Sequence, residues 1–378
     1  MTVTSEQIKR FPRLQFLWLH NVTFQGDFTG CLSELKWICL VYPYGIYRER
    51  RNQHLEATNL LHLENVVVAN LSGIEITKDV LDSLIKGARK LKVLTIYGNT
   101  LISKTPTFPE YSNLEKLTII GFQSLMKIDC SIGKLRWLTD LRFEHCPSIK
   151  KLPEQIGELQ NLQCLCLKYC CGLIELPASV SKIKSLTELD VSYTKIAEMP
   201  STMSKFRQLQ TLNLDLCHEI QELPKLPISL TTLRLTSLSL QTVPNLSYFT
   251  NLVKLLLSDG KDRELLPDED GYPSNEFQTG DLGWIGSLTK LSNLYVCFIN
   301  VRAPTTELSS LSLLKKLVLK GLDLPTFEHL PSNLIFLKLY ETGGKQVHLD
   351  GLPPSEKETP FLPTSLGKSK ENKVYTNN

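Results

Sequence analysis

A short apolar frame, Leu-x-x-Leu-x-Leu, recurs along this chain and restricts its fold more than any other feature. In "LQCLCL" its three apolar positions are Leu162, Leu165 and Leu167. All three positions are Leu, Ile, Val or Phe in each of fourteen copies, which follow one another at intervals of 20 to 39 residues. The leading residues are Leu14, Leu35, Leu63, Leu91, Leu114, Leu138, Leu162, Leu186, Leu209, Leu230, Leu252, Leu291, Leu314 and Leu334. Such a period indicates stacked repeats, because no single copy can bury its apolar face alone.

Apolar and polar residues alternate within each copy, which predicts a short strand with one buried face. The segments between strands carry a second pattern: "LPEQIGELQNL" (152–162), "LPASVSKIKSL" (176–186) and "MPSTMSKFRQL" (199–209). Their apolar spacing predicts one or two helical turns that face the core. We expect short helices or 3-10 turns there, with Pro153, Pro177 and Pro200 at the first helical position.

Together these patterns are those of a leucine-rich repeat. They predict an α/β solenoid of horseshoe form with about 14 repeats, a parallel sheet on the concave side, and short helices, 3-10 turns and loops on the convex side. We assign residues 1–352 to this domain, with long loops at 41–59 and 259–281. The second loop belongs to an insertion with eight acidic and two basic residues, a composition that disfavours burial. Residues 353–378 are expected to be a disordered polar tail or an aborted repeat.

Four cysteines lie between positions 164 and 171, which raises metal binding, disulfide formation and nucleophilic attack as alternatives. Three cysteines of the chain occupy the last position of the repeat, eight residues after the leading leucine, where other copies have Asn or Thr; these are Cys146, Cys170 and Cys217, with Asn99 and Thr194 as their counterparts. We expect this position to turn inward and to bond to loop backbone. Cys164 and Cys166 fall on outward strand positions and should react readily. Because no C-x-x-C pair is present, we expect neither a metal site nor a cofactor.

Outward strand positions form the one surface that all repeats share, so we place protein binding there. The candidate contact residues are Tyr295, Phe298, Lys316, Lys320, Phe336, Lys338, Tyr340, Glu188, Asp190 and Asp215. Other outward positions carry Asp140, Arg142, Glu144, Lys168, Tyr169, Tyr193 and Asn213. Phe16, Trp18 and Trp37, in the first two copies, are candidates for contact with a preceding domain or a capping segment.

Composition excludes several other functions. A net charge of +3 over 378 residues argues against nucleic-acid binding driven by bulk charge. No run of 18 apolar residues is present, so no membrane span is expected. The first residues, "MTVTSEQIKRFPRL", lack the apolar stretch of a signal peptide, which predicts a location in the cytoplasm or the nucleus. No paired acids or nucleophile set occurs at a defined site, so we expect no enzyme activity.

A narrower resemblance rests on three features. These are "GDFTGCLSELKWICLVYPYG" (26–45), the repeated C-x-x-[LI]-x-x-L-P spacing, and the segment "LPISLTTLRL" (226–235). They resemble the leucine-rich-repeat region of plant intracellular immune receptors of the TIR nucleotide-binding class, in particular the flax rust-resistance type. The resemblance implies a module in plant defence that recognises a pathogen effector or a host guardee and restrains the nucleotide-binding domain of the same receptor.

The chain departs from that class in having no G-x-x-x-x-G-K-[ST] phosphate loop and no TIR domain, so we expect a fragment that lacks both. The alternative is a general intracellular leucine-rich-repeat scaffold for protein interactions.

Overall fold

The computed structural model describes residues 2–25, 30–41, 63–73, 76–260, 282–302, 307–322, 330–341 and 346–347. Residues Met1–Val347 form one compact unit and His348–Asn378 a second. The predicted tail at 353–378, and nearly all of the predicted loops at 41–59 and 259–281, lie outside the described residues.

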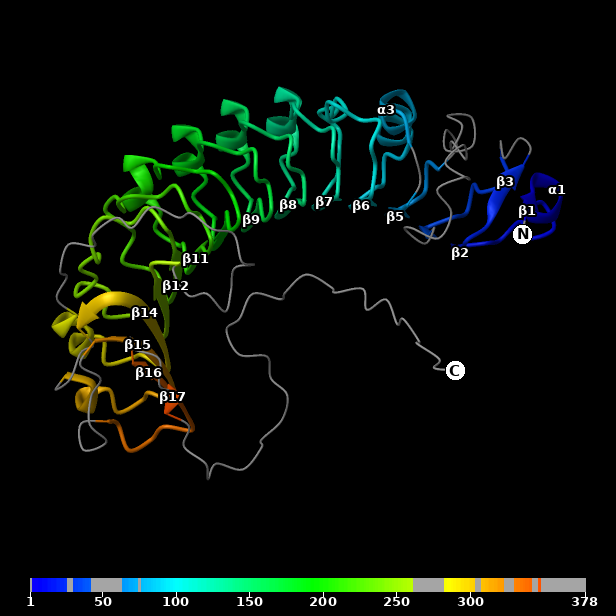
Figure 1. Cartoon of the computed structure of the whole chain (residues 1–378). Coiled ribbons are helices and arrows are strands. Elements are labelled where there is room, and N and C mark those ends of the chain that lie inside the picture. Colours follow the sequence, from blue (N-terminus) through cyan, green and yellow to red (C-terminus); the bar gives the residue numbers. More distant parts are fainter. Residues whose placement is uncertain are drawn as a thin grey trace, which may run out of the picture. The chain divides into compact units, whose positions relative to one another are not determined.

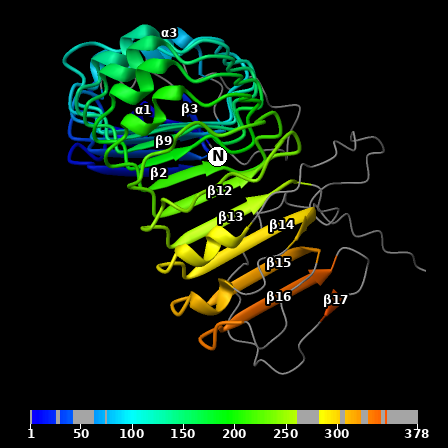
Figure 2. The ribbon, with the colours of Figure 1, turned by 90° about the vertical axis from the view of Figure 1, so that its left-hand side faces the viewer.

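One sheet of 15 strands runs through the described part of the first unit, and strands that follow one another in the repeats are neighbours in it. Its strands are β2 (Phe16–His20), β4 (Trp37–Val41), β5 (Val68–Ser72), β6 (Val93–Tyr97), β7 (Lys116–Ile120), β8 (Asp140–Glu144), β9 (Cys164–Cys166), β10 (Glu188–Asp190), β11 (Thr211–Leu214), β12 (Thr232–Thr236), β13 (Lys254–Ser258), β14 (Asn293–Arg302), β15 (Lys316–Leu322), β16 (Phe336–Glu341) and β17 (Gln346–Val347). All neighbouring pairs are parallel except β16 with β17, which is antiparallel. Figure 2 shows the later strands side by side. The predicted parallel sheet is confirmed.

A small cap precedes the sheet. Strand β1 (Thr2–Thr4) pairs in parallel with β3 (Thr23–Gln25), and the short helix α1 (Ser5–Ile8) follows β1. The side chain of Thr4 accepts a bond from the amide of Gln7, whose side chain accepts one from the amide of Thr4, so the helix begins with a capping box.

The buried core follows the predicted frame. Leu162, Leu165 and Leu167 are fully buried, and the register aligns Leu165 with Leu141 of β8 and Leu189 of β10. The same alignment runs through neighbouring repeats, so the leucines form continuous rows along the solenoid. Burial of each row depends on the repeats at either side.

The third copy starts at a different residue from the one predicted. Strand register pairs Ile38 with Ala69 and Leu40 with Leu71, so the copy leads with Val66 rather than Leu63. The segment "LENVVVANL" offers apolar residues in two frames. The frame that leads with Leu63 uses three bulky apolar residues, whereas the true frame places the small Ala69 at a core position, where it is fully buried.

Short 3-10 helices lie between the central strands, as predicted. They are η2 (Cys130–Lys134), η3 (Glu154–Glu158), η4 (Ala178–Lys182), η5 (Ser201–Lys205), η6 (Gly283–Ser287) and η7 (Glu307–Ser310). Pro153, Pro177 and Pro200 stand one residue before η3, η4 and η5, at the capping position rather than the first helical position predicted. Their extended backbone, with φ between −71° and −53°, lets the proline end the incoming loop.

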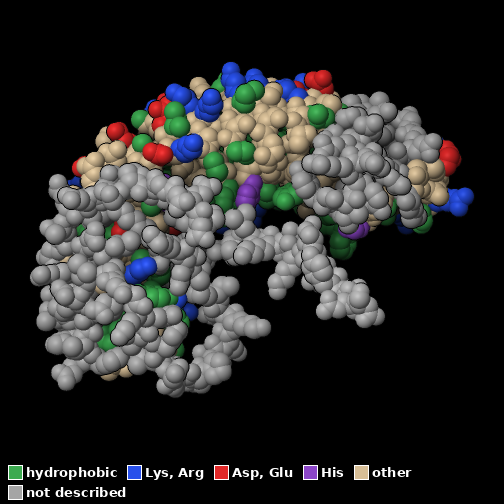
Figure 3. All heavy atoms as spheres, in the orientation of Figure 1, with side chains coloured by type: hydrophobic (Ala, Val, Ile, Leu, Met, Phe, Trp, Pro, Cys, Tyr) green, Lys and Arg blue, Asp and Glu red, His purple; other side chains and the backbone are tan. Residues whose placement is uncertain are grey.

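The charged side chains in view gather on the helix side of the array. In Figure 1 the helices lie on the opposite side from strands β5–β9, and in Figure 3 lysine, arginine and acidic side chains cluster along that edge. This side therefore has the character of a solvated surface.

One α-helix, α3 (Lys78–Gly87), is longer than the turns predicted for this side. Its buried side chains Val80, Leu81, Leu84 and Ile85 share one face, as a period of 3.6 residues requires. The side chain of Thr77 accepts a bond from the amide of Val80 and caps the first turn.

Eight repeats end their strand with a residue in the left-handed backbone region, seven positions after the leading residue. These are Asn21, Gly73, Gly98, Gly121, His145, Tyr169, Tyr193 and Leu216. The non-glycine members have φ between 52° and 59°. The amides of all but Leu216 donate to a carbonyl of the next repeat, as in the bond from His145 to Lys168 at 3.0 Å. This turn directs the chain away from the sheet, and we call these residues the strand-end positions.

Close packing of η3 on η4 requires a glycine at position 157. A Cβ there would lie 2.4 Å from the carbonyl oxygen of Ser179. Gly157→Ala should therefore lower the free energy of unfolding by about 1–3 kcal/mol, because two backbones must separate. Urea titration followed by circular dichroism measures the change. Glu158→Ala, at an exposed site in the same helix, should change stability by less than about 0.5 kcal/mol; equal losses in the two variants would contradict the packing argument.

Candidate protein-binding surface

Outward side chains of the strands form one face of the sheet, which we call the sheet face. Its composition changes along the array, from aromatic at the first strands, through a bonded polar centre, to lysine and aromatic residues at the last. The three regions differ in how much side chain they expose.

The aromatic end lies on β2 and β4. Phe16 and Trp18 are 67% and 69% exposed, and Trp37, the neighbour of Phe16 in the register, is partly buried. These are the residues predicted to contact a preceding domain or a capping segment. Their exposure is consistent with either role, since large aromatic side chains in contact with water favour a partner surface.

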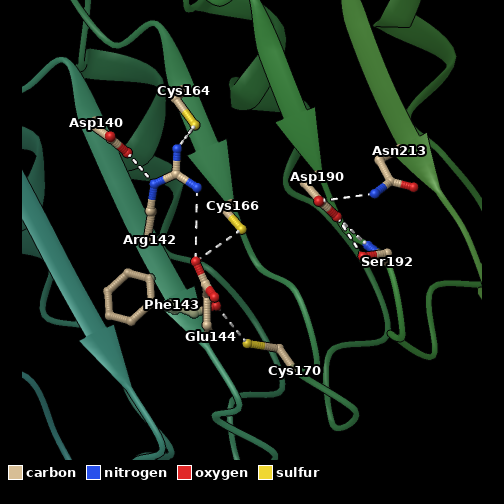
Figure 4. Close-up of polar contacts among 10 residues, drawn as sticks. All are labelled: Asp140, Arg142, Phe143, Glu144, Cys164, Cys166, Cys170, Asp190, Ser192 and Asn213. Carbon is tan, nitrogen blue, oxygen red and sulfur yellow. Dashed lines mark hydrogen bonds and ion pairs between the residues drawn. The ribbon is translucent and has the colours of Figure 1, made fainter. Parts of the chain in front are cut away.

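A charged cluster covers the thiols of β9. The Nε of Arg142 donates to the carboxylate of Asp140 at 2.8 Å, and its Nη2 donates to the Sγ of Cys164 at 3.1 Å (Figure 4). The thiol of Cys166 donates to the Oε1 of Glu144 at 3.7 Å. Cys164 is 8% exposed and Cys166 3%, so the expectation that these outward thiols react readily is wrong. The reason is that long side chains on the adjacent strand lie over them.

The inward cysteines behave as expected. The Sγ of Cys170 donates to the carbonyl of Phe143 at 3.3 Å, and that of Cys217 to the carbonyl of Val191 at 3.1 Å. Asn99 at the same repeat position donates to the carbonyl of Ile76 and accepts from two loop amides. All ten cysteines are free thiols. Among the described residues, no group of three His, Cys, Asp or Glu could hold a metal ion.

Thiol labelling separates two classes of cysteine. Cys130 and Cys171 are exposed and should react first with iodoacetamide. Burial raises the pKa of Cys164 to about 12 and that of Cys217 to about 11, so at pH 8.5 both remain protonated. Only thiolate reacts, so Cys164 should label at least about 100-fold more slowly than Cys171. Mass spectrometry of native protein measures the rates; rapid labelling of Cys164 would contradict the covering by Arg142, and Arg142→Ala should accelerate it.

Two of the three acids predicted as contact residues are occupied by internal bonds. Asp190 accepts from the amide and hydroxyl of Ser192 at 2.9 and 2.6 Å and from Asn213 at 2.9 Å (Figure 4). Asp215 pairs with Arg234 and accepts from the hydroxyl of Thr236.

Asp215 is only 5% exposed, so its predicted place on an open surface is wrong. Glu188 is the remaining acid of that group and is partly exposed.

Three rings stack across consecutive repeats at the strand-end positions. The ring centroids of His145 and Tyr169 are 4.2 Å apart, and those of Tyr169 and Tyr193 are 4.0 Å apart. The Nζ of Lys168 lies 5.2 Å from the centroid of Tyr169. Burial, with a hydrogen bond to Tyr169, raises the pKa of Tyr193. Sequence reasoning placed both tyrosines outward but missed the column; the signal was the equal spacing of 24 residues between 145, 169 and 193.

The last repeats bring together most of the predicted contact residues. The Nζ atoms of Lys338 and Lys320 lie 4.4 and 6.0 Å from the ring centroid of Tyr340. Phe336 is 40% exposed, while Tyr295 and Lys316 are partly exposed. Cations over aromatic rings, beside an exposed ring, are typical of surfaces that bind proteins.

Phe298 does not belong to this surface, because it is 1% exposed. It occupies the strand-end position of its repeat, as Tyr169 and Tyr193 do. Those tyrosines have a left-handed backbone that directs the ring outward, but β14 continues through Phe298 to Arg302. The alternation of Leu294, Val296 and Phe298 therefore continues, and the ring enters the core.

Comparison with known proteins gives a partial sequence match and a complete fold match. No protein-family model matches the chain. Disease resistance protein RPP2A of Arabidopsis thaliana is 26% identical over 145 residues, which are 38% of this chain and 11% of that protein. A solved structure of a TDR receptor matches with a TM-score of 0.60 and 18% identity over 89% of this chain and 57% of that chain. A leucine-rich-repeat protein of Leptospira interrogans matches with a TM-score of 0.50 and 21% identity over 76% of each chain.

In the described part of the chain, no helix is both long and apolar enough to cross a bilayer. Identities near 20% establish the fold and nothing finer. The repeat frame, the parallel sheet, the 3-10 helices and these two structures agree: this chain is a leucine-rich-repeat solenoid.

Proposed function

We propose that this chain is the recognition and regulatory module of a plant intracellular immune receptor and that it acts by binding proteins, not by catalysis. In this proposal the last repeats bind a pathogen effector or a host protein that the effector modifies. The first repeats contact the nucleotide-binding domain of the receptor, in the cytoplasm or the nucleus.

The observation that carries the proposal is the unequal exposure of the sheet face. Its centre is a set of polar groups bonded to one another, whereas Phe16 and Trp18 at one end and Phe336 at the other present rings to solvent. Rings in contact with water at both ends favour two separate protein contacts. The match to a disease resistance protein supports the immune role within this arrangement.

A chimeric receptor tests the proposal. The whole chain is fused to the TIR and nucleotide-binding domains of a plant receptor whose own repeats have been removed and which then causes cell death in leaf tissue. The chain should suppress this cell death, because it covers the switch domain. Phe16→Ala/Trp18→Ala should release it at equal protein abundance.

Trp137→Ala is the matched control, since Trp137 is a tryptophan of similar exposure, 61%, in the turn after η2. Trp137→Ala should leave suppression intact. If neither the native chain nor any variant alters cell death, the regulatory role is wrong and a general protein-interaction scaffold becomes the better interpretation.

Recognition is tested in the same chimera by co-expressing pathogen secreted proteins. One of them should restore cell death, and replacing the exposed late-repeat set by alanine should abolish that response without changing protein abundance. The set comprises Tyr295, Lys316, Lys320, Phe336, Lys338 and Tyr340. Persistence of the response would place recognition elsewhere on the array.

A further inference from the structure

The stacked rings of His145, Tyr169 and Tyr193 stop abruptly at one end. Tyr169 has a ring against each face, and Tyr193 has Tyr169 on one side. His145 is exposed and has Tyr169 on one face only among the printed ring contacts. The strand-end positions of the two preceding repeats are Gly121 and Gly98, which carry no side chain.

Space for another planar group lies beside His145. A Cβ built at Gly121 would meet only the backbone of Gly98, at 3.7 Å, which is ordinary contact distance. Neighbouring parallel strands lie about 4.8 Å apart, so one absent side chain leaves about the thickness of one planar group. A flat group entering from outside could therefore extend the column by one member.

Charge decides which planar group fits. Glu144 precedes His145, and its strand partner is Ile120, next to Gly121. Its Oε1 has two weak contacts, with the Cys166 thiol at 3.7 Å and with Arg142 Nη1 at 3.8 Å. Arg142 itself is engaged more closely by Asp140, at 2.8 Å. The carboxylate of Glu144 is therefore available for a stronger partner.

We propose that this position binds an arginine side chain of a protein partner, with the guanidinium stacked on His145 above Gly121 and hydrogen-bonded to Glu144. Guanidinium is the one protein cation that is planar, stacks on rings and pairs with a carboxylate at the same time. The column already attracts a cation, since Lys168 lies over Tyr169. The inference gives the partner of the proposed function one chemical feature.

Nuclear magnetic resonance with N-acetyl-arginine amide as the probe tests the site in the whole protein. The imidazole signal of His145, assigned by its loss in His145→Ala, should shift with probe concentration and saturate. N-acetyl-lysine amide should bind at least about fivefold more weakly, because an ammonium neither stacks nor forks. Glu144→Gln should weaken arginine binding by about fivefold or more, as expected for loss of a charge-assisted bond.

Glu188→Gln is the matched control, because it removes the same charge from β10, two strands away, and should change arginine affinity less than about twofold. Gly121→Tyr fills the space from within and should abolish the shift. A side chain is tolerated at that backbone conformation, as His145 and Tyr169 show at φ 52° and 59°. Should this variant not fold, His145→Leu, followed by the amide signal of Gly121, replaces it.

Three results would overturn the inference: no shift of His145 with arginine, equal binding of lysine and arginine, or tighter binding of N-acetyl-tryptophan amide, which would assign the position to an aromatic partner. The chimera experiment involves neither His145 nor Gly121. The proposed function and the arginine site can therefore fail independently.

Discussion

Leu165→Asp should lower the free energy of unfolding by about 4 kcal/mol or more, which is enough to unfold the central repeats. Leu165 is fully buried between Leu141 and Leu189 of the adjacent strands. The substitution removes a large apolar group from a packed core and places a carboxylate there without a cation. Because each repeat is stable only through its neighbours, the damage should spread to the repeats on either side.

Lys168→Asp is the matched control three residues away, on the outward side. Lys168 is partly exposed, and its described contact is with the ring of Tyr169, so the loss should be below about 1 kcal/mol. Urea denaturation followed by circular dichroism compares the two variants with the native chain. Equal shifts of the midpoint would mean that the apolar frame does not define the core.

Much of the fold could be predicted because the repeat is written many times. A strand with one buried face requires alternation, and stacking requires the same residue type at the same place in every copy, so chance agreement is negligible. The prediction was wrong where a copy departs from the consensus. Ala69 is buried where other copies have a larger residue, and the ten-residue helix α3 replaces a short turn.

The binding surface could be predicted only in part, because outward position and exposure are different properties. Cys164 points outward yet is covered by Arg142, and Asp215 points outward yet pairs with Arg234. Such covering depends on side chains one strand away, about 20 residues distant in sequence, which a pattern within one copy does not report. Phe298 shows a second limit, because its direction depends on whether the strand ends before it.

The pair of Asp215 and Arg234 provides the other large expected effect. Their side chains are 7% and 19% exposed, and Thr236 also donates to Asp215, at 2.5 Å. Asp215→Ala should lower the free energy of unfolding by about 3–5 kcal/mol, since it leaves a guanidinium in a largely buried place without its carboxylate. Leu256, the neighbour of Arg234 in the register, is an apolar side chain that is 4% exposed and offers that cation no substitute.

The double variant Asp215→Ala/Arg234→Met separates the pair from its surroundings. With the cation removed and an apolar side chain beside Leu256, much of the loss should be recovered, so the two single effects should exceed the double effect by about 2 kcal/mol or more. The exposed pair Lys151–Glu175, 2.7 Å apart with side chains 66% and 56% exposed, should show a coupling below about 1 kcal/mol in the same kind of cycle. If the two cycles gave equal couplings, Asp215 would not be a structural group, and its place among the contact residues would be restored. A large coupling at Asp215 alone assigns this acid to the stability of the sheet face, and leaves partner contact to the exposed residues at its ends.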